Sequence, residues 1–303
     1  MPTATEFFGI TAYNLGPLTT TYTAPSSCST NLKHPIFVNA TSPHDLLAWP
    51  SCSWAIFGDC IPSGKALESG GQQTSVFYQG TSSFFSPGIA CPAGWKTVGL
   101  IAHTESGKFS ASGVLATPAP KLDYITGLPD SIYATDYWKN ILDESETLAY
   151  CCPSGYRGDV YGQCLSTLGP VSSYTYSEFC QLYGRGGELT VISSLDGLTY
   201  SNGVLSRLEP TRTYEVTTTT LDLGVLEGET ENGFSDIAIA SFVPGIPLVY
   251  KKSDMDKKRD SESGTTTATG GSDESVAATV PRQSLISVLG LALGFLAGSG
   301  ILY

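Results

Sequence analysis

The side chains with the most capacity for chemistry are eight cysteines, all of which lie before position 181 of this 303-residue chain. A metal site built from them would need Cys-x-x-Cys pairs or histidines at ligand spacing. The three histidines, His34, His44 and His103, stand apart from any such pattern. An even number of cysteines without ligand spacing predicts disulfides, and we expect no bound metal and no cofactor. The eight are Cys28, Cys52, Cys60, Cys91, Cys151, Cys152, Cys164 and Cys180.

Two of these cysteines, Cys151 and Cys152, are neighbours in the sequence. A bridge between neighbours is strained, so each is predicted to bond a different partner and to fasten another segment to the same strand. We therefore expect four bridges between residues 28 and 180, with the pairing left open by the sequence.

A short pattern around the cysteines occurs twice, as CPAGW at residues 91–95 and as CPSGY at residues 152–156. In each copy proline restricts φ, glycine permits a sharp turn, and the aromatic residue begins the next strand. Each copy is predicted to be a tight turn held by a disulfide. Two copies of five residues make a motif and not a repeat architecture.

Candidate catalytic groups form no recognisable set. Sequence order alone does not exclude a Ser–His–Asp arrangement, but the chain has no Gly-x-Ser-x-Gly motif. Asp143, Glu144 and Glu146 are predicted to form a solvated acidic turn, because a glycosidase needs two carboxylates held a set distance apart. Residues 184–187, GRGG, lack the Lys-Ser/Thr of a phosphate-binding loop and predict a turn. We expect no catalytic residue, although the sequence does not decide whether the chain is an enzyme.

Aromatic side chains and one sequon offer further candidates. Trp49, Trp54, Trp95 and Trp138 could stack on sugar rings in a wall-binding module. Burial in the core is the simpler interpretation, because aromatic residues dominate core energetics. The sequon Asn39-Ala40-Thr41 makes Asn39 a candidate glycosylation site.

Short β-strands separated by Gly and Pro are predicted to position these residues. A Thr run at residues 19–23 is expected to be extended, and residues 129–143 are the best helix candidate before the C-terminal tail, with Asp130 or Ser131 as its cap. Residues 236–252 are interpreted as two strands broken at Pro244-Gly245. The other predicted strands are residues 51–57, 74–78, 95–103, 107–116, 147–151 and 189–193, and residues 212–226 are predicted to be one long Thr-rich strand or a pair of strands.

Composition indicates a globular main domain with an unusually uncharged surface. Hydrophobic residues make up 41% of the chain, which is enough for a sizeable core, whereas charged residues make up only 15%. The formal net charge of −12 includes no basic footprint for nucleic acid. We expect a Cys-rich β ectodomain at residues 1–252, a disordered polar linker at 253–284 and a hydrophobic membrane segment at 285–303.

The C-terminal segment at residues 285–303, LISVLGLALGFLAGSGILY, contains no charged side chain. About 20 apolar residues cross the hydrocarbon core of a bilayer as a helix, and a stretch of this length also suits a lipid-anchor signal. That signal needs small residues at the attachment position and just beyond it, which makes Gly270 and Asp273 the candidate attachment residues. A transmembrane helix and a lipid-anchor signal both stay open.

The cysteines decide the expected compartment, because the remaining signals conflict with them. No Lys or Arg follows the hydrophobic segment, and the N-terminal residues lack the basic start and apolar run of a signal peptide. Taken alone, these features favour a cleaved anchor signal or a tail-anchored protein whose domain faces the cytosol. Disulfides persist in oxidising compartments, so we expect an extracellular domain at the plasma membrane or cell wall.

Four stretches carry a resemblance in their order along the chain: LGPLTTTYTAPSSC at residues 15–28, SPGIACPAGW at 86–95, ETLAYCCPSGY at 146–156 and IPLVYKKSDMD at 246–256. Together they resemble a group of uncharacterised surface proteins of filamentous ascomycete fungi. Members join a Cys- and Thr-rich β domain, through a Ser/Thr linker, to one C-terminal membrane segment. The resemblance implies no activity and no catalytic residues. Many members continue into a basic cytoplasmic tail, whereas this chain stops at Tyr303, which favours a lipid anchor over a signalling receptor.

These observations predict a non-enzymatic, membrane-anchored protein of a fungal cell surface or wall. Its expected partners are the membrane and cell-wall polysaccharide. One alternative is a carbohydrate-binding or carbohydrate-active ectodomain, which wall glucan or chitin would retain or serve as substrate. Another is a cytosol-facing tail-anchored protein, which would carry eight free thiols.

Overall fold

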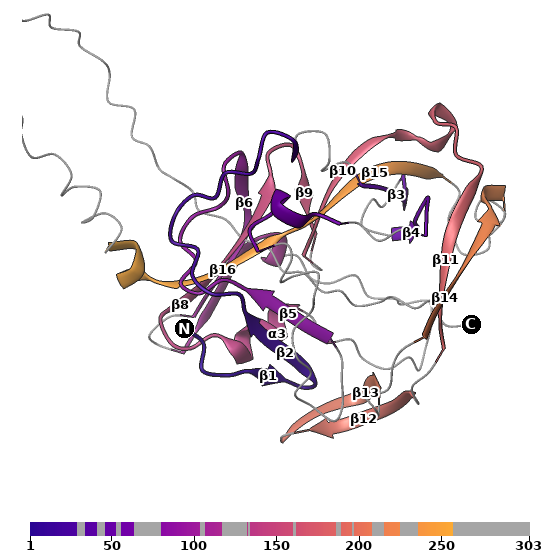
Figure 1. The fold of residues 1–303 in the computed structure, drawn as a ribbon. Coiled ribbons are helices and arrows are strands. Elements are labelled where there is room, and N and C mark those ends of the chain that lie inside the picture. The colour runs from indigo at the N-terminus through magenta and orange to yellow at the C-terminus, as the bar shows by residue number, and fades with distance from the viewer. Residues whose placement is uncertain are drawn as a thin grey trace, which may run out of the picture.

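The computed structural model describes residues 1–28, 34–40, 46–52, 56–63, 80–103, 107–116, 132, 134–159, 162–185, 189–195, 197–207, 215–224 and 236–256. Sixteen strands lie in these residues, so the fold is mainly β, as predicted (Figure 1). The predicted membrane segment at residues 285–303 lies outside them, as does the predicted linker from residue 257 onward. Among the described helices, none is both long and apolar enough to cross a bilayer.

One antiparallel sheet has four strands in the order β16-β8-β6-β7. They are β16 (Ile246–Lys251), β8 (Glu146–Pro153), β6 (Trp95–His103) and β7 (Phe109–Gly113). The segment after β5 covers the outer edge of β16, because Phe85 N donates to Pro247 O at 2.9 Å and Val249 N donates to Phe85 O at 2.8 Å. A small sheet lies beside this edge and contains β1 (Glu6–Phe7), β2 (Ile10–Asn14) and β5 (Gly80–Phe84), with β2 and β5 parallel.

A second sheet has five strands in the order β4-β3-β15-β10-β9. They are β4 (Leu46–Ala48), β3 (His34–Asn39), β15 (Ile237–Pro244), β10 (Gln163–Pro170) and β9 (Arg157–Gly158). A ribbon of β11 (Glu178–Arg185) and β14 (Glu215–Asp222) continues this sheet beyond β4, because Cys180 N donates to Trp49 O at 2.6 Å. The hairpin of β12 (Leu189–Leu195) and β13 (Leu198–Arg207) forms a separate two-stranded sheet at the bottom of Figure 1, and its buried side chains, Ile192 and Val204, belong to the same hydrophobic cluster as the four-stranded sheet.

One nearly continuous strand joins the two main sheets. β15 lies in the middle of the five-stranded sheet and β16 at the edge of the four-stranded sheet, and Figure 1 shows them as one orange run across the molecule. The break falls at Pro244-Gly245, as predicted, and Gly245 N donates to Gly162 O at 3.0 Å. Because both faces of this run are covered, its residues are almost all buried and apolar.

The helix α3 (Ala134–Ile141) confirms the later part of the helix predicted at residues 129–143. Its buried residues, Ala134, Tyr137, Trp138 and Ile141, recur at the three- and four-residue spacing that places side chains on one helix face. The proposed caps at residues 130 and 131 lie outside the described residues.

The predicted strands differ in outcome. β6 occupies the predicted residues 95–103, while β8, β12 and the pair β15–β16 confirm the other apolar stretches. Residues 107–116 contain β7 followed by a 3-10 turn, η2 (Val114–Ala116), and the described part of residues 212–226 contains β14. The Thr run at residues 19–23 is not in a strand, and residues 74–78 lie outside the described part.

The strand predicted at residues 51–57 is wrong in its described part. Ser51 and Cys52 lie in a bend, Ile56 is exposed, and residues 58–60 form the 3-10 turn η1 (Gly58–Cys60). Cys52 and Cys60 are bonded to different segments of the chain.

The five-stranded sheet separates two hydrophobic clusters. Ile36 and Val38 of β3 face a large cluster, which contains the buried apolar side chains of α3, β6, β8, β16 and the small sheet. Phe37 between them faces the opposite side, as alternation along a strand requires. There it joins a small cluster, whose buried members are Phe37, Ala48, Phe179, Leu223, Ile237 and Ile239.

Candidate functional site

All eight cysteines are paired in disulfides, which confirms the predicted chemistry and the predicted limits at residues 28 and 180. Cys151 and Cys152 bond different partners, as predicted, and so tie two other segments to β8. The four bridges are Cys28–Cys60, Cys52–Cys180, Cys91–Cys151 and Cys152–Cys164.

The two copies of the Cys-Pro-x-Gly-aromatic motif form tight turns that lie side by side. Trp95 N donates to Pro92 O, and Tyr156 N donates to Pro153 O, each at 3.0 Å. The third residue of each turn is glycine with positive φ, which is the requirement of a type II turn. Trp95 pairs with Pro153 across β6 and β8, so the repeated motif builds one disulfide-held corner of the four-stranded sheet.

The predicted solvated acidic turn is found at Glu144, which is exposed in a turn, but the prediction is wrong for Glu146, which is fully buried. Its Oε1 lies 2.8 Å from the Met1 amino group and 3.9 Å from Lys251 Nζ, and its Oε2 accepts a hydrogen bond from Asp143 N at 2.9 Å. Asp143 Oδ1 accepts a hydrogen bond from the Thr3 hydroxyl at 2.9 Å. These carboxylates therefore fasten the first residues of the chain to β8 and β16, a structural task that the sequence did not indicate.

The two described histidines are engaged in packing. His34 meets Phe57 edge to face at 4.5 Å, and burial lowers the pKa of its imidazole. His103 stacks on Phe109 at 4.1 Å, and its Nδ1 lies 3.1 Å from Leu142 O. The third, His44, lies outside the described residues, among which no set of three His, Cys, Asp or Glu side chains is grouped to hold a metal ion.

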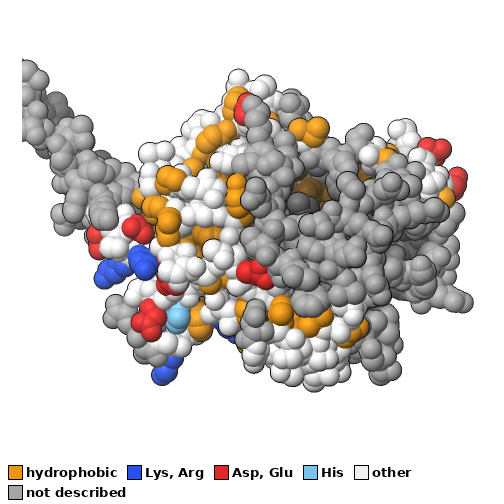
Figure 2. Space-filling view, turned by 60° about the horizontal axis from the view of Figure 1, so that its bottom comes forward, with side chains coloured by type: hydrophobic (Ala, Val, Ile, Leu, Met, Phe, Trp, Pro, Cys, Tyr) orange, Lys and Arg blue, Asp and Glu red, His pale blue; other side chains and the backbone are white. Residues whose placement is uncertain are grey.

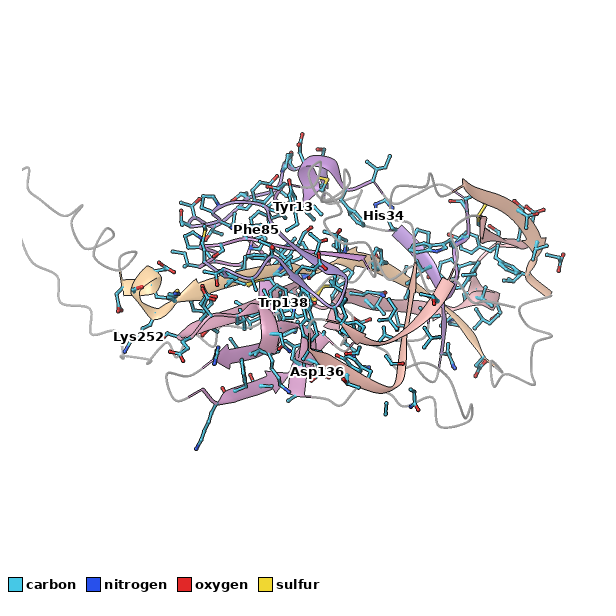
Figure 3. The ribbon with its side chains drawn as sticks, turned by 90° about the horizontal axis from the view of Figure 1, so that it is seen from below. Tyr13, His34, Phe85, Asp136, Trp138 and Lys252 are labelled. Carbon is cyan, nitrogen blue, oxygen red and sulfur yellow. A yellow bond between two sulfur atoms is a disulfide. The ribbon has the colours of Figure 1, made fainter. Side chains whose placement is uncertain are left out.

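The described tryptophans pack against the hydrophobic core. Trp138 is fully buried and meets Phe84 edge to face at 5.7 Å, and Figure 3 places it among the ribbons of the interior. Trp49 and Trp95 are half-buried against the large cluster. Trp54 lies outside the described residues. The core interpretation is confirmed for Trp138.

Asn39, the candidate glycosylation site, is the last residue of β3 and is only 7% exposed. It pairs with Ile237 in the five-stranded sheet, and the next residue, Ala40, donates its N–H to Asp236 O at 2.9 Å. Burial of the side chain weighs against a glycan at this position in the folded domain. Glycosylation of Asn39 stays a prediction. The lipid-anchor candidates Gly270 and Asp273 lie outside the described residues.

A shallow pocket of about 300 Å³ lies between α3 and the edge strand β7. Its charged lining residue, Lys139, lies 3.5 Å from Asp136 Oδ1. The lining is otherwise mostly aliphatic and aromatic, which offers burial to an apolar group and no reactive side chain. The lining residues are Ile101, Phe109, Ala111, Leu115, Ala116, Thr135 and Lys139.

A surface feature that was not predicted from the sequence is a pair of tyrosines between η3 (Val171–Ser173) and β11. The ring centroids of Tyr174 and Tyr176 are 6.1 Å apart, and the ring planes differ by 28°. Tyr176 meets Phe37 of the small cluster edge to face at 5.6 Å, while Tyr174 is 37% exposed. The alternation of tyrosine with small hydroxyl residues could have predicted this pair, because residues two apart lie on the same face of an extended chain.

The rest of the visible surface carries few charges. On the face in Figure 2, most described atoms belong to uncharged groups, and most blue side chains lie toward one end, whereas red side chains also lie near the centre and at the opposite end. Lys252 marks the end with most of the blue side chains in Figure 3, where the described chain leaves the domain.

No model of a known protein family, no curated protein and no solved structure matches this chain.

Proposed function

We propose that the chain is a non-enzymatic, membrane-anchored protein of a fungal cell surface or wall, with its β domain outside the cell. The observation that carries this proposal is the pairing of all eight cysteines. Cytosolic thiols are kept reduced, whereas disulfides persist in secreted and surface proteins. The pairing therefore favours this proposal over a cytosol-facing tail-anchored protein.

The non-enzymatic part of the proposal is supported by what the candidate catalytic groups do. Glu146 is held by ion pairs with the Met1 amino group and Lys251. His103 is stacked on Phe109, with its Nδ1 near a backbone carbonyl oxygen. These contacts give both side chains a structural role, which supports a non-enzymatic domain.

The anchoring part of the proposal rests on the sequence of residues 285–303. These 19 residues carry no charge and follow a polar stretch rich in Gly, Ser and Thr. Transfer of so much apolar surface out of water supplies a strong drive toward a bilayer, at roughly 25 cal/mol per Å². A polar linker before it would hold the β domain away from the membrane surface.

The anchor is tested by comparing the full chain with a chain that lacks residues 285–303, each carrying an internal tag in the linker. We expect the full chain in the membrane pellet and the truncated chain in the soluble fraction. Retention of the truncated chain in the pellet would show that another segment is the anchor.

Phospholipase treatment then separates the two forms of anchor. Release of the full chain indicates a lipid, and a variant in which Gly270 and Asp273 are both replaced by Lys should then lose the lipid. Resistance to release indicates a spanning helix, for which the same double variant should behave like the parent chain.

A further inference from the structure

We infer that the surface around Tyr174 is a binding site for a neutral polysaccharide chain. The site lies on the segment at residues 171–177, which passes from β10 to β11 over the small cluster. That the polymer belongs to the cell wall rests on the proposed function, whereas the ligand class is argued from the site itself.

The segment is held in place before any ligand arrives. Tyr174 N donates to Val171 O at 2.9 Å, and Ser177 O accepts a hydrogen bond from Leu223 N at 2.8 Å. Tyr176 rests edge to face on Phe37, which is fully buried. Just beyond it, Cys180 is bonded to Cys52. A site fixed in this way loses little conformational entropy on binding, which favours affinity.

The outer part of the site exposes apolar surface to solvent. Tyr174 is 37% exposed, and Leu168 is 43% exposed. The pairing of β10 with β15 shifts register between Thr167 and Gly169, and such a bulge redirects a side chain away from its ladder position. Gly169 has φ +150°, and the ring of Tyr174 would lie 4.0 Å from a Cβ atom at that position. The bulge therefore presents Leu168 beside the segment that bears the tyrosines.

The chemistry around the ring suits a sugar. A pyranose has a flat C–H face that can lie on the electron-rich face of an aromatic ring, and a rim of hydroxyl groups that need hydrogen-bond partners. Hydroxyl side chains both donate and accept hydrogen bonds. The exposed hydroxyl residues of the segment are Ser172, Ser173, Thr175 and Ser177.

Charge narrows the ligand class further. Residues 158–184 contain no Lys or Arg, so this stretch offers no counter-charge to a phosphate backbone or to an acidic polymer. A quaternary ammonium ligand is favoured by aromatic rings that surround it, whereas Tyr174 and Tyr176 are nearly parallel. A neutral saccharide needs neither a positive counter-charge nor a cage of aromatic rings, so it fits this surface.

A polymer fits better than a single sugar, because one exposed ring offers little affinity. Aromatic stacking changes an affinity by roughly threefold to tenfold. A chain with many equivalent sugars keeps the local ligand concentration high and so raises retention well above that of one unit.

The test uses the purified full chain in mild detergent and measures retention on insoluble β-glucan and on chitin. We expect at least one polymer to retain the parent chain and the variant Tyr174→Ala to lose retention by roughly tenfold. Tyr174→Phe should keep most of the retention, because it preserves the ring.

Tyr13→Ala is the matched control, because Tyr13 is exposed to nearly the same degree, 36%, on β2 (Figure 3). It should leave retention unchanged. Mapping of the four disulfides in each variant establishes that the chains are folded alike.

Equal retention of the parent and Tyr174→Ala would overturn the inference, as would no retention of the parent on any neutral polysaccharide. A secreted protein captured through Tyr174, without retention on polysaccharide, would also contradict it and assign the surface to a protein partner. These failures leave a surface-located, fully oxidised protein intact. Free thiols and a cytosolic location would instead overturn the proposed function.

Discussion

The two faces of the five-stranded sheet are stabilised in different ways. The large cluster contains two adjacent bridges and the fully buried Trp138 and Tyr150. The small cluster has six buried residues, and beside it Cys52–Cys180 joins positions 128 residues apart. A large core gains most of its stability from buried area, whereas a small core depends more on a cross-link. The exposed Tyr174 therefore lies on the side of the molecule whose stability depends most on a disulfide bond.

The largest expected effect comes from removing that bond with Cys52→Ser and Cys180→Ser together. Loop closure over 128 residues contributes about 5 kcal/mol to the free energy of unfolding in the simple entropy treatment. We expect hydrogen exchange to accelerate first in β11, β14 and β4, while β6 and β8 stay protected.

The matched control is Cys152→Ser with Cys164→Ser, which opens a loop of only 12 residues inside the large cluster. This variant should lose about 3 kcal/mol of unfolding free energy. Its hydrogen exchange should not accelerate selectively around the small cluster. Uniform acceleration in both double variants would contradict the contrast between the two clusters.

In the large cluster, Trp138→Ala should reduce the free energy of unfolding by about 3–5 kcal/mol, because it removes a fully buried aromatic side chain and leaves a cavity. Chemical denaturation measures the loss as a lower midpoint. Trp95→Ala, at a half-buried position, should cost distinctly less. Equal losses of unfolding free energy in the two variants would show that burial of Trp138 does not make a larger contribution than the half-buried Trp95.

Alkaline pH should act through the large cluster. Burial raises the pKa of Tyr137 and of Tyr150, and the neighbouring Asp159 raises that of Tyr150 further. Unfolded tyrosine titrates near pH 10. Above that pH the unfolded chain releases protons that the folded chain keeps, so stability is full below pH 10 and falls by about 1.4 kcal/mol per pH unit for each such group.

Denaturation midpoints measured between pH 8 and pH 11 check this dependence. Tyr150→Phe should flatten the decline, because it removes one titrating group from the core. An unchanged slope in this variant would rule out Tyr150 as a contributor.

A smaller effect is expected at the corner made by the repeated motif. The Tyr156 hydroxyl lies 2.9 Å from Ser241 Oγ and links the second turn to β15. Tyr156→Phe should cost about 1 kcal/mol of unfolding free energy, the usual contribution of one hydrogen bond. Thermal unfolding of the variant beside the parent measures it, and an identical midpoint would show that the contact contributes nothing.

The sequence predicted those elements whose apolar residues are contiguous. The pair β15–β16 consists largely of buried apolar residues broken at Pro244-Gly245, so pattern and turn chemistry agreed. β6 is mostly half-buried, and its start is marked by the turn glycine Gly94 directly before it. The double cysteine was informative for a geometric reason, because neighbouring cysteines bond separate partners.

The remaining elements depend on contacts distant in sequence. β5 consists of GTSSF and pairs in parallel with β2, far away in the chain, so no local hydrophobic period marks it. Glu146 was predicted to be exposed because it lies in a local cluster of acidic residues. In the fold its carboxylate is buried and paired with the Met1 amino group and Lys251, both of which are distant in sequence. The alternation of Tyr174 and Tyr176 was visible, but only the sheet beneath them decides which ring reaches solvent.

The most direct test of the account counts the free thiols of the full chain taken from its own cells. Native protein is alkylated without reduction, digested and mapped by mass spectrometry. We expect no alkylated cysteine and four linked peptide pairs, among them Cys52 with Cys180 and Cys152 with Cys164. Recovery of eight alkylated cysteines would contradict it and would favour a domain that faces the cytosol.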